Sequence, residues 1–179
     1  MVYKHSYQTP EKFSNIIMES DGEYLTGLWF ESSSDASKHE LHYEEKELSI
    51  FKEVCEWLNL YFSGSIPHFT PKYKINNLTP FRQEVIDIMN TINYGTVLTY
   101  NDIAKIIAKN REIERMSAQA VGGAVGWNPI CIIIPCHRVI GSNGNLTGYG
   151  GGIKNKVELL KHEGIDLSKY FIPKQGTVL

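Results

Sequence analysis

The sequence predicts a mixed α/β (α+β) protein, in which a small α/β unit precedes a mostly helical one. Two β-rich runs flank Asp21-Gly22, and such a pair is a hairpin signal because it tolerates a positive φ. Apolar residues then recur at helical spacing from Leu48 to Phe62, and capped helical patterns follow from Thr79 onward. The length of 179 residues suits one large domain or two small ones.

The first half, residues 1–77, is expected to hold the hairpin, one helix and a connection. The runs at 13–19 and 24–30 form the hairpin, and the helix ends near Gly64. Residues 66–77 contain two prolines and indicate a short strand or a linker. No catalytic constellation is visible in this half. Its scattered histidines lack the spacing of metal ligands, so no metal or cofactor is expected: His5, His39, His42 and His68.

The second half, residues 78–168, shows three helical patterns and is followed by a tail, residues 169–179. Thr79-Pro80 provides a capping threonine and a proline at the first helical position. Thr99 opens the second helix with a pattern like a capping box, completed by Asp102.

The third helix is predicted at residues 118–126, after the N-cap Ser117, and it contains three glycines. Each glycine costs about 1 kcal/mol relative to alanine in a helix interior. A face of such small residues permits close packing of another helix, or close approach of a different surface such as DNA. The order of helix, polar turn and small-residue helix is compatible with a helix-turn-helix module.

The reactive side chains follow an apolar run at residues 130–134, which predicts a buried strand. Pro135 should end that strand because it has no amide donor. Cys136, His137 and Arg138 follow directly. A thiol with the ordinary cysteine pKa of about 8.5 is only slightly ionised at neutral pH, so the cysteine needs activation by the imidazole, across a chain turn or through a water. An isolated pair of this kind is more often a buried structural cysteine beside a surface histidine.

Charge and cysteine content narrow the functional class. Residues 1–79 contain 7 basic and 12 acidic residues, residues 80–165 contain 9 and 7, and residues 166–179 contain 2 and 1. The net charges of these three segments are therefore −5, +2 and +1, which sum to −2. The acidic half should therefore face away from nucleic acid, and DNA affinity should be modest and salt-sensitive. Three cysteines without paired spacing argue against disulfides, and Cys55 and Cys131 are expected in the core. No signal-like or long apolar run is visible, which predicts a cytoplasmic protein that does not use a membrane.

The motif at residues 135–141 is Pro-Cys-His-Arg-Val-Ile-Gly. Asn128-Pro129 precede it, and residues 146–152 and 159–164 follow it. Together these segments resemble the O6-alkylguanine-DNA alkyltransferases. This family is also called the methylated-DNA–protein-cysteine methyltransferases, and the resemblance covers roughly residues 80–165. It implies a ribonuclease H-like first domain and a winged helix-turn-helix second domain, whose small-residue helix approaches the minor groove.

The resemblance also implies the reaction. A monomer, using no cofactor, would bind duplex DNA containing O6-alkylguanine, with O4-alkylthymine as a second candidate substrate. The nucleotide is flipped out of the stack, and the alkyl group passes to the sulfur of Cys136. The product is a thioether that water does not hydrolyse, so each molecule acts once and is inactivated.

Five residues resemble the catalytic residues of the family. Cys136 resembles the alkyl acceptor, and His137 the water-mediated base that ionises it. Glu163, directly before Gly164 at an expected helix C-terminus, resembles the acid that orients His137. Tyr100 resembles the tyrosine that protonates the leaving guanine and helps to turn the nucleotide out, and Asn128 resembles the brace of the turn around the cysteine.

The substrate-binding residues follow the family less closely. Tyr149 resembles the ring that lines the guanine pocket, and Arg138 resembles a structural arginine that is not a substrate ligand. Gln119 stands where the family commonly has an arginine finger that fills the hole left by the flipped base. Gly150 stands where some relatives carry a serine that bonds the guanine, so a donor is missing and the pocket should be larger. The helix expected to approach DNA contributes three positions: Gln119, Ala120 and Gly123.

Two other functions compete with alkyl transfer. The first is a lesion-binding protein that does not transfer, as in relatives that lack the cysteine; here Cys136 is present. The second is a cysteine hydrolase built on Cys136 and His137, for which no separate oxyanion-hole motif is visible. The number of transfers per molecule separates the three: one, none or many.

Overall fold

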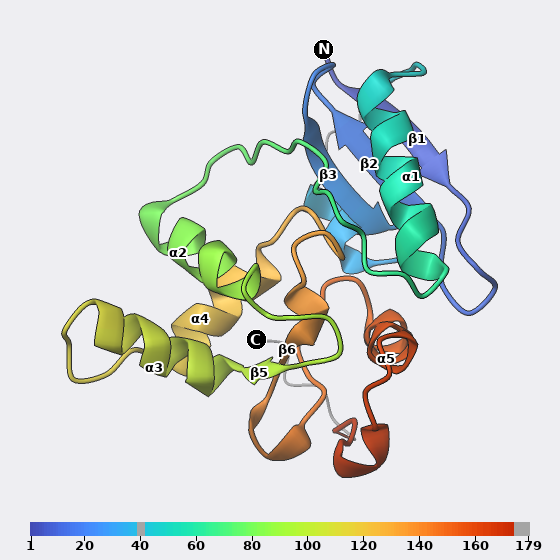
Figure 1. Ribbon diagram of the computed structural model, residues 1–179. Helices are drawn as coiled ribbons and strands as arrows, with labels where there is room; N and C mark the ends of the chain where they lie inside the picture. Colours follow the sequence, from blue (N-terminus) through green and yellow to red (C-terminus); the bar gives the residue numbers. More distant parts are fainter. Residues whose placement is uncertain (39–41, 174–179) are drawn as a thin grey trace.

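A computed structural model describes residues 1–38 and 42–173 of the chain (Figure 1). His39 and residues 174–179 of the predicted tail lie outside the described residues. In the part that is described, none of the helices combines the length and the apolar character that crossing a membrane requires.

The first half of the chain forms a four-stranded sheet with one helix across its face (Figure 1). The strands, in the spatial order β3-β2-β1-β4, are β1 (Tyr3–Tyr7), β2 (Ile16–Ser20), β3 (Leu25–Phe30) and β4 (Glu44–Glu45). The antiparallel pair β2 and β3 confirms the predicted hairpin. The sequence pattern does not predict β1, because four of its five residues are half-buried and no clean alternation results.

The helix on this sheet, α1 (Ser49–Phe62), confirms the predicted amphipathic helix. Gly64 follows it with a φ of +85°, in the left-handed region that glycine adopts without strain. The segment after α1 contains no named strand. Its one bridge joins Tyr73 to Leu25 of β3.

The second half contains the three predicted helices and a fourth one, whose end at His162 confirms the helix C-terminus expected before Gly164. They are α2 (Pro80–Met89), α3 (Tyr100–Asn110), α4 (Ala118–Gly126) and α5 (Ile153–His162). The first three pack against one another, and α5 lies apart from them (Figure 1). Each predicted cap is confirmed, because the side chains of Thr79, Thr99 and Ser117 accept the amide hydrogen three residues later. Asp102 completes the capping box by accepting the Thr99 amide at 3.0 Å.

Short elements connect these helices. A parallel pair of two-residue strands, β5 (Leu98–Thr99) and β6 (Val139–Ile140), joins the start of α3 to the chain that follows Cys136. The 3₁₀ helices are η1 (Ser34–Lys38), η2 (Cys136–Arg138), η3 (Ser142–Gly144) and η4 (Leu167–Lys169). The predicted tail begins in contact with the rest of the chain, since Phe171 bridges Asn145.

Residues 130–134 do not form the predicted strand. Within the described chain only Ile130 of this run pairs, with Leu28 of β3, and the backbone then turns. Ile132 has a φ of 68°, a left-handed conformation that is rare for a β-branched residue and costs on the order of 1–3 kcal/mol. Its side chain is 1% exposed, so burial of a turn, rather than strand pairing, explains the apolar run. Cys131 is buried, as expected, but it lies in this turn.

One cluster of buried apolar side chains runs through both halves of the chain. Leu28 and Tyr61 come from the first half, and Tyr100, Ile130 and Cys136 come from the second. The candidate nucleophile therefore lies where the two halves share their core.

We expect Thr99→Ala to lower the free energy of unfolding by about 1–2 kcal/mol, because it removes both the cap of α3 and the reciprocal bond with Asp102. Urea denaturation followed by circular dichroism measures this change. Thr70→Ala is the matched control, since Thr70 is exposed and lies outside the helices. An equal effect of the two substitutions would contradict the role assigned to the cap.

Candidate active site

Cys136 begins η2, directly after Pro135, and is 5% exposed. Pro135 has φ −81° and ψ 57°, outside the strand region. The chain thus turns at Pro135–Cys136, which is one of the two arrangements that the sequence left open. Because of this turn, Cys136 and His137 do not point to opposite faces as neighbours on a strand would.

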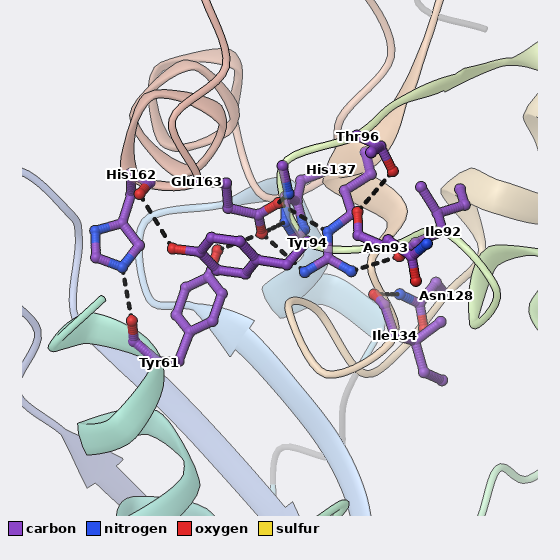
Figure 2. A network of polar contacts seen from close by, with 12 residues as sticks. Tyr61, Ile92, Asn93, Tyr94, Thr96, Asn128, Ile134, His137, His162 and Glu163 are labelled. Carbon is purple, nitrogen blue, oxygen red and sulfur yellow. Dashed lines mark hydrogen bonds and ion pairs between the residues drawn. The ribbon is translucent and has the colours of Figure 1, made fainter. Parts of the chain in front are cut away.

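Asn128 holds the turn that carries the cysteine, and Figure 2 shows its contact with Ile134. Its side-chain amide nitrogen lies 3.1 Å from the carbonyl oxygens of Ile130 and Ile134 and 3.1 Å from the sulfur of Cys136. Its amide oxygen accepts the Ile130 N–H at 3.0 Å. The side chain thereby satisfies backbone groups that a strand would have paired, and its N–H directed at sulfur favours the thiolate.

His137 is completely buried and its Nε2 lies 2.7 Å from Oε1 of Glu163. Burial alone would raise the pKa of Glu163, but hydrogen bonds from His137 and Arg138 and the positive charge of Arg138 hold that pKa well below its usual range. The ionised carboxylate requires a donor, so Nε2 carries the ring proton. Burial lowers the pKa of His137, which leaves the ring neutral at pH 7 and its Nδ1 unprotonated.

Nδ1 is the nitrogen of His137 that can accept a proton. Among the described residues it has no hydrogen-bond partner, although it is buried. The ring is therefore fixed by Glu163 on one side, and its basic nitrogen is left for a further group. This arrangement is typical of a general base held by an orienting carboxylate.

Glu163 collects donors from three separate segments (Figure 2). Arg138 donates twice, from Nε to Oε2 at 2.9 Å and from Nη2 to Oε1 at 3.0 Å, and its Nη1 donates to the carbonyl of Ile92 at 2.7 Å. The Gly95 amide donates to Oε2 at 3.2 Å, and the Tyr61 hydroxyl donates to Oε1 at 2.8 Å. Arg138 thus serves Glu163 and the backbone, and Tyr61 brings a contact from the first half, where sequence analysis expected none.

Tyr100 is the first residue of α3 and is 5% exposed. Its hydroxyl donates to the carbonyl oxygens of Gly148, at 2.9 Å, and Thr147, at 3.3 Å. Burial and the nearby charge of Cys136 raise the pKa of Tyr100 far above its ordinary value. The phenol therefore keeps its proton at neutral pH and remains a donor.

Lys156 is a further charged residue near the thiol that the sequence analysis did not identify. It is fully buried, and its Nζ donates to the carbonyl oxygens of Val139 at 2.6 Å and Thr147 at 3.0 Å. Burial lowers the pKa of Lys156 to about 8, against an opposing effect of the Cys136 charge. A sequence signal exists, since Lys156 lies three and four positions before the buried Leu159 and Leu160 and so shares their helix face.

The predicted DNA-facing positions of α4 are exposed: Gln119, Ala120 and Gly123. A side-chain carbon added at Gly123 or at Gly126 would meet no atom within 4 Å. Close packing of another helix therefore does not explain these two glycines. They leave an open, smooth surface on α4.

The loop after η3 contains Tyr149 and Gly150. The hydroxyl oxygen of Tyr149 is buried without a hydrogen-bond partner among the described residues. A side-chain carbon at Gly150 would overlap the carboxylate of Asp35. The expected enlargement of the pocket at Gly150 is therefore wrong at this point, because Asp35 fills the space that the missing side chain leaves.

We expect Tyr61→Phe to lower the free energy of unfolding at pH 7 by about 1.5–3 kcal/mol, the range for a hydrogen bond to a charged group. The substitution keeps the buried ring and removes one donor from Glu163. Tyr43→Phe, at a residue 49% exposed, is the control. Equilibrium unfolding in urea gives both values, and a cost below about 0.5 kcal/mol for Tyr61→Phe, as expected for an ordinary surface change, would contradict a stabilising role for this bond.

Comparison with known proteins agrees with the site. Residues 80–165 match the family described as "6-O-methylguanine DNA methyltransferase, DNA binding domain". The methylated-DNA–protein-cysteine methyltransferase of Haemophilus influenzae is 36% identical over 156 residues, which are 87% of this chain and 84% of that protein.

Solved structures from Mycobacterium tuberculosis resemble the whole fold. Its O6-methylguanine methyltransferase is 35% identical, with a TM-score of 0.75 over 98% of this chain and 97% of that one. An OGT of the same organism, solved in complex with DNA, is 34% identical, with a TM-score of 0.75 over 90% and 92%. With this identity along most of its length, the chain belongs to the family of methylated-DNA–protein-cysteine methyltransferases.

Proposed function

We propose that this protein repairs DNA by moving the alkyl group of O6-alkylguanine in duplex DNA to the sulfur of Cys136, once per molecule. The observation that carries the proposal is the buried Cys136, with the Asn128 amide on its sulfur and, in the same 3₁₀ turn, His137 held by Glu163. Membership of the methyltransferase family supports the reaction, and the relative solved with DNA supports the partner.

The proposed first step is ionisation of the thiol. A water carries the Cys136 proton to Nδ1 of His137, the unpartnered nitrogen of the ring among the described residues. Glu163, on Nε2, stabilises the imidazolium that forms. The buried Lys156 and the Asn128 amide favour the resulting thiolate by charge and by hydrogen bonding.

In the second step the thiolate attacks the alkyl carbon of a nucleotide flipped out of the duplex. A sulfur–carbon bond forms and the bond between that carbon and O6 breaks, so the electron pair passes to the guanine. Tyr100, which is protonated at neutral pH, donates its phenolic proton to the guanine, and the phenolate that remains takes up the proton held by the His137 imidazolium. The product is a thioether on Cys136 and an unmodified guanine.

We assign DNA binding to a winged helix-turn-helix in residues 78–168 and a ribonuclease H-like fold to residues 1–77, with a tail at 169–179. The exposed face of α4, with its two open glycines, would approach the DNA backbone closely. The net charge of −5 in residues 1–79 keeps that half away from phosphates. A monomer acting in the cytoplasm, and O4-alkylthymine as a second substrate, stay predictions.

The two competing functions receive less support. A lesion-binding protein needs no activated thiol, yet Cys136 carries a donor on its sulfur and lies in the same 3₁₀ turn as a neutral, oriented imidazole. A hydrolase would release its product and turn over, whereas the proposed thioether stays on the protein. Counting the alkyl groups taken up per molecule decides among the three.

Incubation with duplex DNA containing O6-methylguanine should add one methyl group per protein, as measured by intact mass. Peptide mapping should place it on Cys136, because neither Cys55 nor Cys131 has a histidine beside it in the sequence. Cys136→Ser is the control and should take up none. Methylation of another cysteine, or release of more than one repaired guanine per protein, would sink the proposal.

Tyr100→Phe should slow transfer by a factor on the order of ten to a thousand, the scale of general acid catalysis, because it keeps the ring and loses the proton. DNA affinity should change little. Single-turnover kinetics with methylated duplex give the rate, and a binding titration with the Cys136→Ser background gives the affinity. A rate equal to that of the wild type would remove Tyr100 from the mechanism.

Gln119→Ala should slow transfer from duplex DNA and leave the reaction with free O6-benzylguanine nearly unchanged. Unstacking a base costs a few kcal/mol, and a side chain that fills the gap offsets part of this cost only in a duplex. Gln119→Arg should in addition bind DNA more tightly at low salt. Equal effects of Gln119→Ala on both substrates, or no effect on either, would show that Gln119 fills no gap.

A further inference from the structure

An acidic side chain of the first half reaches the loops around Cys136. Asp35 lies on η1, which follows β3, and is 2% exposed. A buried carboxylate is costly unless it is held by donors, so its presence here calls for a role. The residue lies 101 positions before Cys136 in the chain (136 − 35), and no sequence motif connects the two.

Asp35 and its neighbour contact the two segments that flank the nucleophile. The Cys131 thiol donates to Oδ2 of Asp35, with 3.4 Å between sulfur and oxygen. The hydroxyl of Ser34 donates to the carbonyl of Gly150 at 3.0 Å. A side-chain carbon on Gly150 would overlap Oδ1 of Asp35. The carboxylate thus lies between the turn that leads into Cys136 and the loop that carries Gly150.

The loop that carries Gly150 lies beside Cys136. The Tyr100 hydroxyl donates to the Gly148 carbonyl, and Tyr100 lies within range of the Cys136 charge. Tyr149, on the same loop, lies close to Cys131, Cys136 and Asp35. The position of this loop therefore sets how much room remains beside the thiol.

We propose that Asp35 is a positioning residue for alkyl transfer: its carboxylate occupies the place of a side chain at position 150 and fixes the loop that limits which alkyl groups reach Cys136. This inference rests on the proposed function. Only glycine at position 150 leaves room for the carboxylate, and only the carboxylate fills the space that glycine leaves. Asp35 and Gly150 should therefore behave as one coupled pair.

The test is a double-substitution cycle of four proteins: the wild type, Asp35→Ala, Gly150→Ser and the double variant. Single-turnover rates are measured with O6-methylguanine duplex and with free O6-benzylguanine. Gly150→Ser alone should slow methyl transfer about tenfold, the scale of an overpacked contact. The double variant should recover to within about threefold of the wild type, because the serine then fills the space of the lost carboxylate.

Asp35→Ala alone should raise the ratio of benzyl to methyl transfer rates several-fold, because the loop gains room beside the thiol. Asp35→Asn keeps the shape of the side chain and should keep the ratio of the wild type. A side chain that mattered only for stability would lower the fraction of protein that reacts and leave this ratio unchanged. If Asp35→Asn changed the ratio as much as Asp35→Ala, the claim that shape matters would be overturned.

Thermal unfolding of the four proteins tests the packing without any reaction. Gly150→Ser should lower Tm, and Asp35→Ala in the same chain should restore part of the loss. Wild-type protein that takes up no alkyl group overturns the proposed function and the positioning role with it. Wild-type transfer with equal rates in all four proteins, or a double variant as slow as Gly150→Ser, overturns the role of Asp35 alone.

Discussion

The rest of the site depends on the hydrogen bonds that the buried carboxylate of Glu163 accepts. Its side chain is fully shielded from water, and it accepts from Tyr61, Gly95, His137 and Arg138. Removal of a charge from water costs several kcal/mol, which only such a complete set of donors offsets. The same contacts fix the imidazole, anchor the turn that begins at Cys136 and hold α1 against the end of α5. One carboxylate thus fixes the side chains around Cys136 and also stabilises the packing of α1 against α5.

Charge is distributed so that each group keeps the protonation state its position requires. The low pKa of Glu163 keeps its carboxylate an acceptor for Nε2 of His137, and burial keeps that ring neutral with its basic nitrogen available. Tyr100 keeps its proton because burial and the charge of Cys136 both oppose its ionisation. Lys156 places a positive charge near the thiol, in a position where water cannot screen it fully. The groups proposed as base and acid, His137 and Tyr100, therefore each hold the protonation state in which the proposed reaction begins.

Local signals in the sequence predicted local structure well. The hairpin around Asp21-Gly22 and the capped starts of α2, α3 and α4 agree with the structure, because turn and cap chemistry acts within a few residues. The family resemblance located Cys136 and His137, and the structure brings Glu163 and Asn128 against them.

The sequence-based predictions failed where the structure depends on contacts between distant residues or on burial of a turn. Residues 130–134 are apolar because a turn is buried, and hydrophobicity alone does not distinguish that from a strand. Tyr61 and Asp35 meet partners 102 and 96 residues away, which no local pattern encodes.

The core shared by the two halves has a consequence for how the protein comes apart. Tyr61 contributes to the same buried cluster as Tyr100 and Cys136, so neither half can melt without exposing apolar surface of the other. Heating should then give one calorimetric transition, with equal van't Hoff and calorimetric enthalpies. Amide hydrogens of α1 and of η2 would exchange through the same global opening. The turn that carries Cys136 and the sheet would therefore unfold together.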